Sequence, residues 1–125
     1  MSDDMLLRAL DQAGDAIIVI DREGLIRGWN QHAEKLFGHR TDDVLGQNVE
    51  LMIPERLRSA HDQGFGAAMD SGHLASDGKA RRTKAVRPDG SKVFVEMTFA
   101  VINDDSGAAI GSVAVAREWV REPSA

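Results

Sequence analysis

The spacing of apolar and polar residues near the start of the chain predicts a β-hairpin followed by a helix. Two short, mainly apolar runs, 16–20 and 25–29, flank the polar segment Asp21-Arg22-Glu23-Gly24. Apolar runs of this length around a tight turn that ends in glycine are typical of paired antiparallel strands. Asn30 is then a good N-cap for a helix that ends at Gly38, since glycine readily adopts the left-handed conformation found after helix C-termini.

Further helices are predicted before the hairpin and across the middle of the chain. Residues 4–11 have the periodicity of a short N-terminal helix. Thr41 is expected to cap a single helical turn. Pro54 opens the longest helix, because proline is well tolerated in a first turn, and this helix runs to about Ser71, just before Gly72.

The second half of the chain predicts three strands. Residues 78–86 alternate in polarity, 92–102 form a long strand and 108–117 form the last one. One face of the long strand is apolar and consists of Val93, Val95, Met97, Phe99 and Val101. The predicted order is therefore two strands, several helices and three strands.

Composition limits the chain to one domain. Its 125 residues are 42% apolar, which is enough for a single core. We expect an N-terminal flanking helix in 1–14, the domain itself in 15–120, and a tail or the start of a linker in 121–125. No apolar run approaches the roughly 18 residues of a membrane span, and the N-terminus is acidic, so we expect a cytoplasmic protein without membrane contacts.

Charge and residue content argue against several kinds of function. The formal net charge of −5 argues against nucleic acid as a partner. Cysteine is absent, which excludes disulfides, thiolate catalysis and cysteine-ligated metal sites. The paired acidic residues stand at predicted element ends, where carboxylates favour caps and turns, and no phosphate-binding loop or supported catalytic triad is found. We therefore expect that the chain is not an enzyme.

The order of the elements, with the hairpin-to-helix segment 16–38, resembles the PAS family of sensory domains. This resemblance implies an α+β fold: a five-stranded antiparallel sheet with helices packed on one face and an N-terminal flanking helix. It also implies a homodimer formed through the N-terminal helix and an output domain in the full-length protein. The chain lacks the cysteine of light-sensing flavin PAS domains, and Arg117-Glu118-Trp119-Val120 departs from the Asp-Ile-Thr-like ending of many PAS domains.

The longest predicted helix carries a histidine within an apolar stripe. At spacings of three and four, this stripe consists of Leu57, Ala60, His61, Gly64, Phe65 and Ala68. His61 should therefore point into the domain as a neutral imidazole, bound either to a backbone carbonyl or to a metal. The small residues around Phe65 suit either a flat ligand close to the helix or tight packing of the helix on the sheet. His32, His39 and His73 are expected at the surface.

The segment 54–62, Pro-Glu-Arg-Leu-Arg-Ser-Ala-His-Asp, resembles the haem-binding helix of oxygen sensors of the FixL type. The resemblance implies haem b as cofactor, His61 as the proximal iron ligand, and Arg81 as the group that meets bound oxygen or a haem propionate. Met97 and Phe99 would form apolar pocket walls, and Met97 is also a candidate sixth ligand. The full cofactor-binding set comprises His61, Arg81, Leu57, Gly64, Phe65, Ala68, Thr83, Met97 and Phe99.

Strand alternation agrees with this assignment, because Arg81 shares a face with Thr83 whereas Arg82 and Lys84 point the other way. Other positions depart from the family pattern. Ala67 and Ala75 replace basic residues near the propionates, where His73 and Lys79 are substitutes, and Ser76 replaces a bulky apolar residue. Two readings therefore stay open: a haem-based sensor of a diatomic gas or of redox state, and a PAS module that binds another small molecule, or none, and acts in dimerisation.

Overall fold

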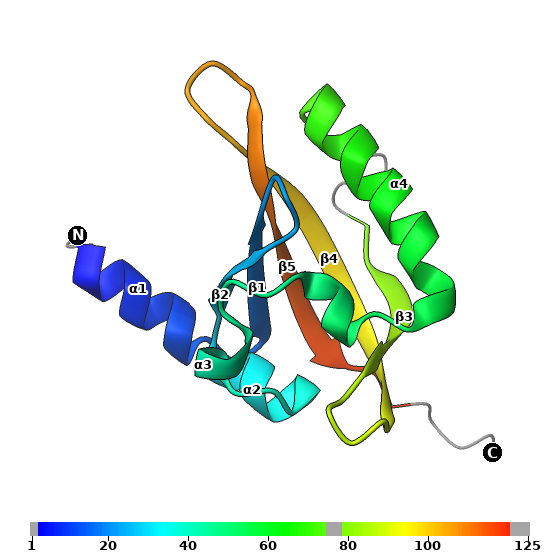
Figure 1. Cartoon of the computed structure of the whole chain (residues 1–125). Coiled ribbons are helices and arrows are strands. Elements are labelled where there is room, and N and C mark those ends of the chain that lie inside the picture. Colours follow the sequence, from blue (N-terminus) through cyan, green and yellow to red (C-terminus); the bar gives the residue numbers. More distant parts are fainter. Residues whose placement is uncertain (1–2, 75–78, 121–125) are drawn as a thin grey trace.

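The computed structural model describes residues 3–74 and 79–120 and contains one antiparallel sheet with the strand order β2-β1-β5-β4-β3 (Figure 1). The strands are β1 (Ala16–Asp21), β2 (Ile26–Trp29), β3 (Arg81–Val86), β4 (Lys92–Asn103) and β5 (Ala109–Glu118). The N-terminal and C-terminal strands β1 and β5 are thus neighbours in the centre of the sheet. This central pairing continues over the full length of β1, from Ala16 opposite Ala116 to Asp21 opposite Gly111.

The helices between β2 and β3 lie on one face of the sheet, whereas the first helix extends away from it (Figure 1). They are α1 (Asp3–Gln12), α2 (Gln31–Phe37), α3 (Thr41–Val44), the 3-10 helix η1 (Val49–Met52) and α4 (Glu55–Ser71). No residue of α1 is buried. The α+β fold class, the five-stranded antiparallel sheet and the N-terminal flanking helix are confirmed.

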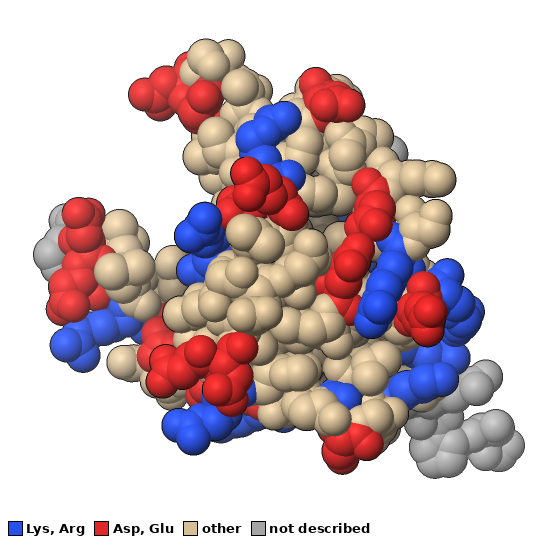
Figure 2. Space-filling model, viewed as in Figure 1, with Lys and Arg blue, Asp and Glu red and all other residues tan. Residues whose placement is uncertain are grey.

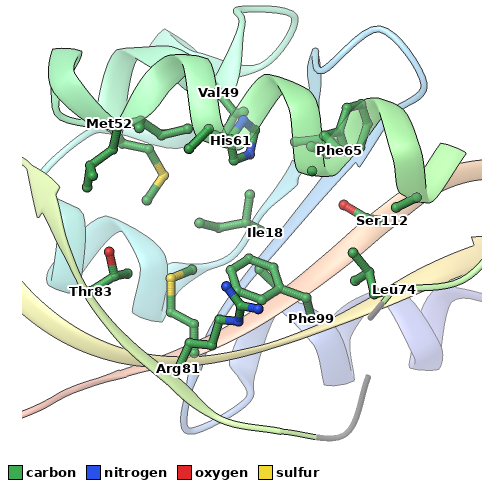
Figure 3. Close-up of a pocket in the computed structure, with 18 of the residues that line it drawn as sticks. Ile18, Val49, Met52, His61, Phe65, Leu74, Arg81, Thr83, Phe99 and Ser112 are labelled. Carbon is green, nitrogen blue, oxygen red and sulfur yellow. The ribbon is translucent and has the colours of Figure 1, made fainter. Parts of the chain in front are cut away.

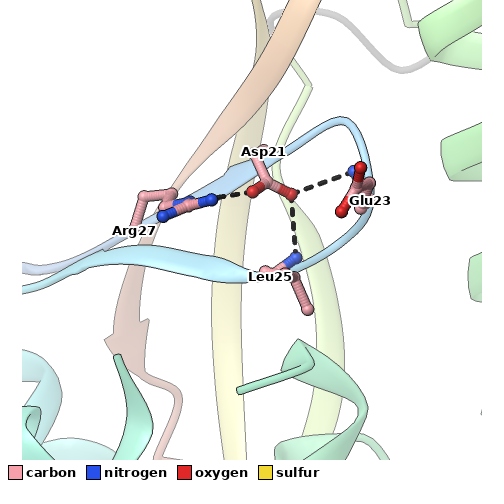
Figure 4. Close-up of polar contacts among 4 residues, drawn as sticks. All are labelled: Asp21, Glu23, Leu25 and Arg27. Carbon is pink, nitrogen blue, oxygen red and sulfur yellow. Dashed lines mark hydrogen bonds and ion pairs between the residues drawn. The ribbon is translucent and has the colours of Figure 1, made fainter. Parts of the chain in front are cut away.

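The predicted hairpin is closed by the carboxylate of Asp21 (Figure 4). Its Oδ1 accepts hydrogen bonds from the backbone N–H groups of Glu23 and Leu25, at 2.9 and 3.1 Å, and its Oδ2 accepts one from Arg27 Nε at 2.8 Å. The Arg27 guanidinium and these backbone amides hold the pKa of Asp21 below its ordinary value.

Asn30 connects three elements with one buried side chain. Its Oδ1 caps α2 by accepting from Ala33 N–H at 3.0 Å and also accepts from Ile17 N–H at 2.8 Å. Its Nδ2 donates to the carbonyls of Leu10 and Asp15, at 2.9 and 3.0 Å. The end of α1, the start of β1 and the start of α2 are therefore held together by hydrogen bonds to one amide.

Thr41 does not cap α3, so this prediction is wrong. Thr41 is the first residue of the helix, and Arg40 at the N-cap position makes no side-chain capping bond. The Thr41 hydroxyl instead donates to the Trp29 carbonyl at 2.9 Å, and its N–H donates to Glu34 Oε2 at 2.7 Å. That backbone bond lowers the pKa of Glu34.

The buried apolar residues form two clusters, and the half-buried Phe65 packs against both. The large cluster lies between the sheet and the short helices α2, α3 and η1, and includes Trp29, Phe37 and Val95. The small cluster, formed by Ala68, Met69 and Ala109, lies under the C-terminal end of α4. Ala68 and Met69 are the buried residues of this 17-residue helix, so α4 is fixed to the sheet mainly at one end.

Within the described ranges, no helix combines the length and the apolar character needed to cross a membrane. The face of the molecule in Figure 2 carries acidic and basic side chains side by side, with no continuous basic surface.

Candidate ligand-binding site

A cavity of about 680 Å³ lies between α4 and the inner face of the sheet (Figure 3). Its volume is within the range of small-molecule sites, roughly 300–1,000 Å³. All residues of the predicted cofactor-binding set line it: Leu57, His61, Gly64, Phe65, Ala68, Arg81, Thr83, Met97 and Phe99. The structure thus brings together side chains from α4, β3 and β4 that are up to 42 positions apart in the sequence.

The glycines of α4 face open space. A Cβ atom built on Gly64 or Gly66 would meet no atom within 4 Å outside the local helix backbone. Tight packing of the helix on the sheet therefore does not explain these residues, although each glycine costs a helix about 1 kcal/mol relative to alanine. Gly64 lines the cavity and Gly66 does not, so Gly64 leaves room beside the pocket.

His61 lies on the α4 wall of the cavity with an unpartnered nitrogen. Its side chain is 30% exposed, yet Nδ1 is buried and makes no hydrogen bond to any described residue. The Oδ1 atom of Asp62 is 3.7 Å away, and the imidazole stacks on Phe65 with a centroid separation of 6.1 Å and an interplanar angle of 5°. Among the described residues, the expected alternative of a histidine bonded to a backbone carbonyl is not observed.

Strand β3 presents different side chains to the two faces of the sheet. Arg81 points into the cavity from below in Figure 3. On the opposite face the Arg82 guanidinium lies 4.6 Å from the ring centroid of Trp119, and Lys84 Nζ lies 5.5 Å from that of Phe94. The alternation predicted for this strand is therefore present.

The cavity has the electrostatic character of a site for an apolar molecule with acidic groups. Its described lining contains no aspartate or glutamate, although the chain as a whole has a net charge of −5. Arg81 supplies a cation, and Met97, Phe99 and Ile18 supply apolar surface. Arg81 is exposed at the edge of this surface, where its guanidinium can pair with an anionic group of a bound molecule.

A bare metal ion does not fit this site. Among the described residues, no group of three or more His, Cys, Asp or Glu side chains is arranged to hold an ion. His61 has no such cluster around it, which suits a metal that brings its other ligands with it, as haem iron does.

Several lining residues escaped the sequence analysis. Val49, Met52 and Ile53 come from η1 and the residue after it, whose position over the sheet depends on long-range packing. Ser112 also lines the cavity, and the alternation Ser112, Ala114, Ala116 on β5 was the available signal. His73, expected at the surface, is exposed and lies at the cavity, whereas the predictions for Ala75 and Ser76 concern residues outside the described ranges.

His39, also expected at the surface, is half-buried. Its ring meets Trp29 edge-on, with centroids 6.1 Å apart, and its Nε2 is buried without a hydrogen bond to a described residue. Burial lowers the pKa of His39, partly opposed by the nearby Asp43 carboxylate.

Comparison with known proteins agrees with this architecture. The Escherichia coli protein named oxygen sensor protein DosP is 26% identical over 102 residues, which cover 82% of this chain and 13% of DosP. The sensor protein FixL of Bradyrhizobium diazoefficiens is 48% identical over 48 residues, 38% of this chain and 10% of FixL. The chain thus corresponds to a small part of either relative.

A solved PAS domain from Colwellia psychrerythraea superposes with a TM-score of 0.76 at 22% identity, covering 93% of this chain and 95% of that one. The family described as the PAS fold matches residues 4–118, which include every strand and helix from β1 to β5. The chain therefore belongs to the PAS family.

Proposed function

We propose that this chain is the haem-binding sensory domain of a signalling protein and that it responds to a diatomic gas or to the redox state of the iron. The observation that carries the proposal is the His61 imidazole, whose buried nitrogen has no partner among the described residues, on the wall of a cavity of about 680 Å³. The resemblance of residues 54–62 to the haem-binding helix of FixL-type sensors adds support, as does the similarity to DosP, which is named an oxygen sensor.

In this proposal each wall of the cavity has a distinct task. Haem, when bound, supplies an iron centre that binds small gases and changes oxidation state. His61 holds it from α4 through a neutral imidazole nitrogen. Arg81 pairs with an acidic group of the cofactor or donates a hydrogen bond to a polar ligand. Met97 and Phe99 exclude water from the sheet side, and in one state the Met97 thioether would supply a further ligand.

The signal would leave the domain through the sheet. β4 and β5 line the cavity and are paired from Val95 opposite Glu118 to Asn103 opposite Ala109. A change at the cavity would therefore bias an element joined to the chain ends, which we assign to an output domain of the full-length protein. On α1, exposed apolar side chains such as Leu7, 66% exposed, offer a surface to a second copy of the chain.

The first test is an absorption spectrum of the protein purified from cells supplied with haem, beside His61→Ala. We expect a Soret band in the wild type that is lost or shifted in the variant, and that added imidazole restores. His32→Ala, a change on α2 away from the cavity, is the matched control and should keep the wild-type spectrum.

A colourless wild type that is folded by circular dichroism would contradict the haem proposal. The chain would then be a PAS module for another small molecule or for dimerisation, as the alternative holds. We propose no catalytic activity for the domain and place it in the cytoplasm; turnover of any substrate would overturn the first of these assignments.

A further inference from the structure

Ser112 is a buried polar residue in the floor of the cavity. It lies on β5, is 9% exposed, and Figure 3 shows its oxygen directed into the cavity. Its neighbours across the sheet are apolar, since Ile20 of β1 stands opposite it on one side and Val101 of β4 on the other.

The Ser112 hydroxyl makes no hydrogen bond to any residue that the structure describes. The oxygen itself borders the open space of the cavity, where water or a bound molecule can reach it. The need for a small side chain does not explain the serine, since the next inner positions of the same strand, 114 and 116, are alanine. A polar atom at this point of an otherwise apolar wall would meet a molecule held in the cavity.

The side chain of His61 lines the same cavity from the opposite wall. His61 on α4 has a buried nitrogen without a hydrogen bond, and Ser112 lies across the cavity on the sheet (Figure 3). A molecule that fills the space between α4 and the sheet would contact both side chains.

We infer that Ser112 is a ligand-contacting residue whose hydroxyl donates a hydrogen bond to an acceptor atom of the molecule in the cavity. The hydroxyl acts as donor because the described lining has no acidic residue and includes Arg81, so the polar atoms of a matching ligand are acceptors. This inference rests on the part of the proposed function in which the cavity holds a small molecule, and does not require that molecule to be haem.

The test compares wild type with Ser112→Ala, using Ser59→Ala as control, since Ser59 is exposed on α4 and does not line the cavity. Each protein is purified from cells supplied with haem, and native mass spectrometry measures the fraction that carries a bound molecule and its added mass. For a haem adduct, transfer to excess apomyoglobin gives the release rate. We expect Ser112→Ala to release the molecule roughly three- to tenfold faster, as the loss of one hydrogen bond predicts, and Ser59→Ala to match wild type.

The ligand-free proteins supply a readout that distinguishes contact from a structural role. Because the hydroxyl has no partner in the described protein, ligand-free Ser112→Ala should unfold at the same urea concentration as wild type or at a higher one. A variant that unfolds earlier and keeps the bound fraction and release rate of wild type would overturn the inference. Ser112→Thr keeps a donor and should release the molecule more slowly than Ser112→Ala.

The outcomes separate this inference from the haem proposal. A wild type that carries haem, with the same release rate in Ser112→Ala, overturns the role of Ser112 and leaves haem binding intact. A wild type that carries a different molecule, lost from Ser112→Ala, supports Ser112 and overturns haem. A wild type without any bound molecule overturns both.

Discussion

The side chain of Asn30 stabilises the fold through both the oxygen and the nitrogen of its amide group. Four hydrogen bonds join it to Ala33 and Ile17 through its oxygen and to Leu10 and Asp15 through its nitrogen. The residue itself is buried, 5% exposed. An unsatisfied buried group costs more than a lost hydrogen bond at the surface, so the neighbours of Asn30 depend on its presence.

We therefore expect Asn30→Ala to lower the free energy of unfolding by roughly 2 to 4 kcal/mol. Asn48→Ala is the matched control, because Asn48 is exposed and caps η1 with a single bond to Glu50 N–H. Its loss should cost about 1 kcal/mol. Urea unfolding measures both, and equal costs for the two variants would contradict this account of Asn30.

Individual residues were predictable from the sequence where their partners are local. Asn30 was identified as the N-cap of α2, because its capping bond reaches only to Ala33. Its bonds to Leu10, Asp15 and Ile17 span 13 to 20 positions and left no local signal. Thr41 was misassigned for the same reason. Its hydroxyl donates to the Trp29 carbonyl and its N–H donates to the Glu34 carboxylate, and both acceptors lie outside α3.

At the level of elements, α4 contains two glycines that both lower helix stability but differ in their position relative to the cavity. Gly64 and Gly66 both face open space, but only Gly64 lines the cavity. Alanine at either position should stabilise the helix by about 1 kcal/mol, because glycine gains most freedom on unfolding. The two positions should differ only in their effect on binding.

We predict that Gly64→Leu lowers the affinity for the molecule in the cavity about tenfold or more, because the added side chain occupies part of the pocket. Gly66→Leu is the control and should bind like wild type, since it adds the same side chain outside the cavity. Titration of both variants with haem by absorbance measures this, with thermal unfolding as the check on the fold. Equal affinities would mean that Gly64 does not border the bound molecule.

The alternation of β3 was the most accurate prediction at this scale, because side-chain direction in a strand depends only on position. Arg81 faces the cavity and Arg82 lies over Trp119, as expected. The existence of the cavity was harder to predict from the sequence. It depends on how far α4 stands from the sheet, and that is decided by contacts at its C-terminal end, where Ala68 and Met69 meet Ala109.

For the molecule as a whole, the titrating groups predict how stability changes with pH. His39 has a pKa below its ordinary value of 6.5, so the unfolded chain binds its proton more readily than the folded one. Stability should therefore be highest above pH 6.5 and should fall as the pH drops below that value. The carboxylates of Asp21, Glu34, Asp89 and Asp104 have lowered pKa values, so their contribution is present above their ordinary values of 3.8 or 4.5 and is lost in more acidic solution.

We expect His39→Phe to remove the part of this decline that begins near pH 6.5, while the decline below pH 4.5 remains. Phenylalanine keeps a ring beside Trp29 and carries no titratable group. His73→Phe, at an exposed position, should leave the profile unchanged. Urea unfolding between these pH values measures the three proteins, and an unchanged decline in His39→Phe would mean that another group is responsible.

The division of the core into two clusters has a consequence for the whole domain. The C-terminal end of α4 is anchored by Ala68 and Met69 and by the bond from Asn103 Nδ2 to the Gly72 carbonyl at 3.1 Å, whereas the N-terminal half of α4 buries no residue. A molecule that binds between the N-terminal half of α4 and the sheet does not have to displace a buried side chain of α4. It fills the space that core side chains fill under the rest of the helix. The bound molecule then forms part of the apolar interior, so the free energy of unfolding of the domain should increase with the fraction of protein that carries the molecule.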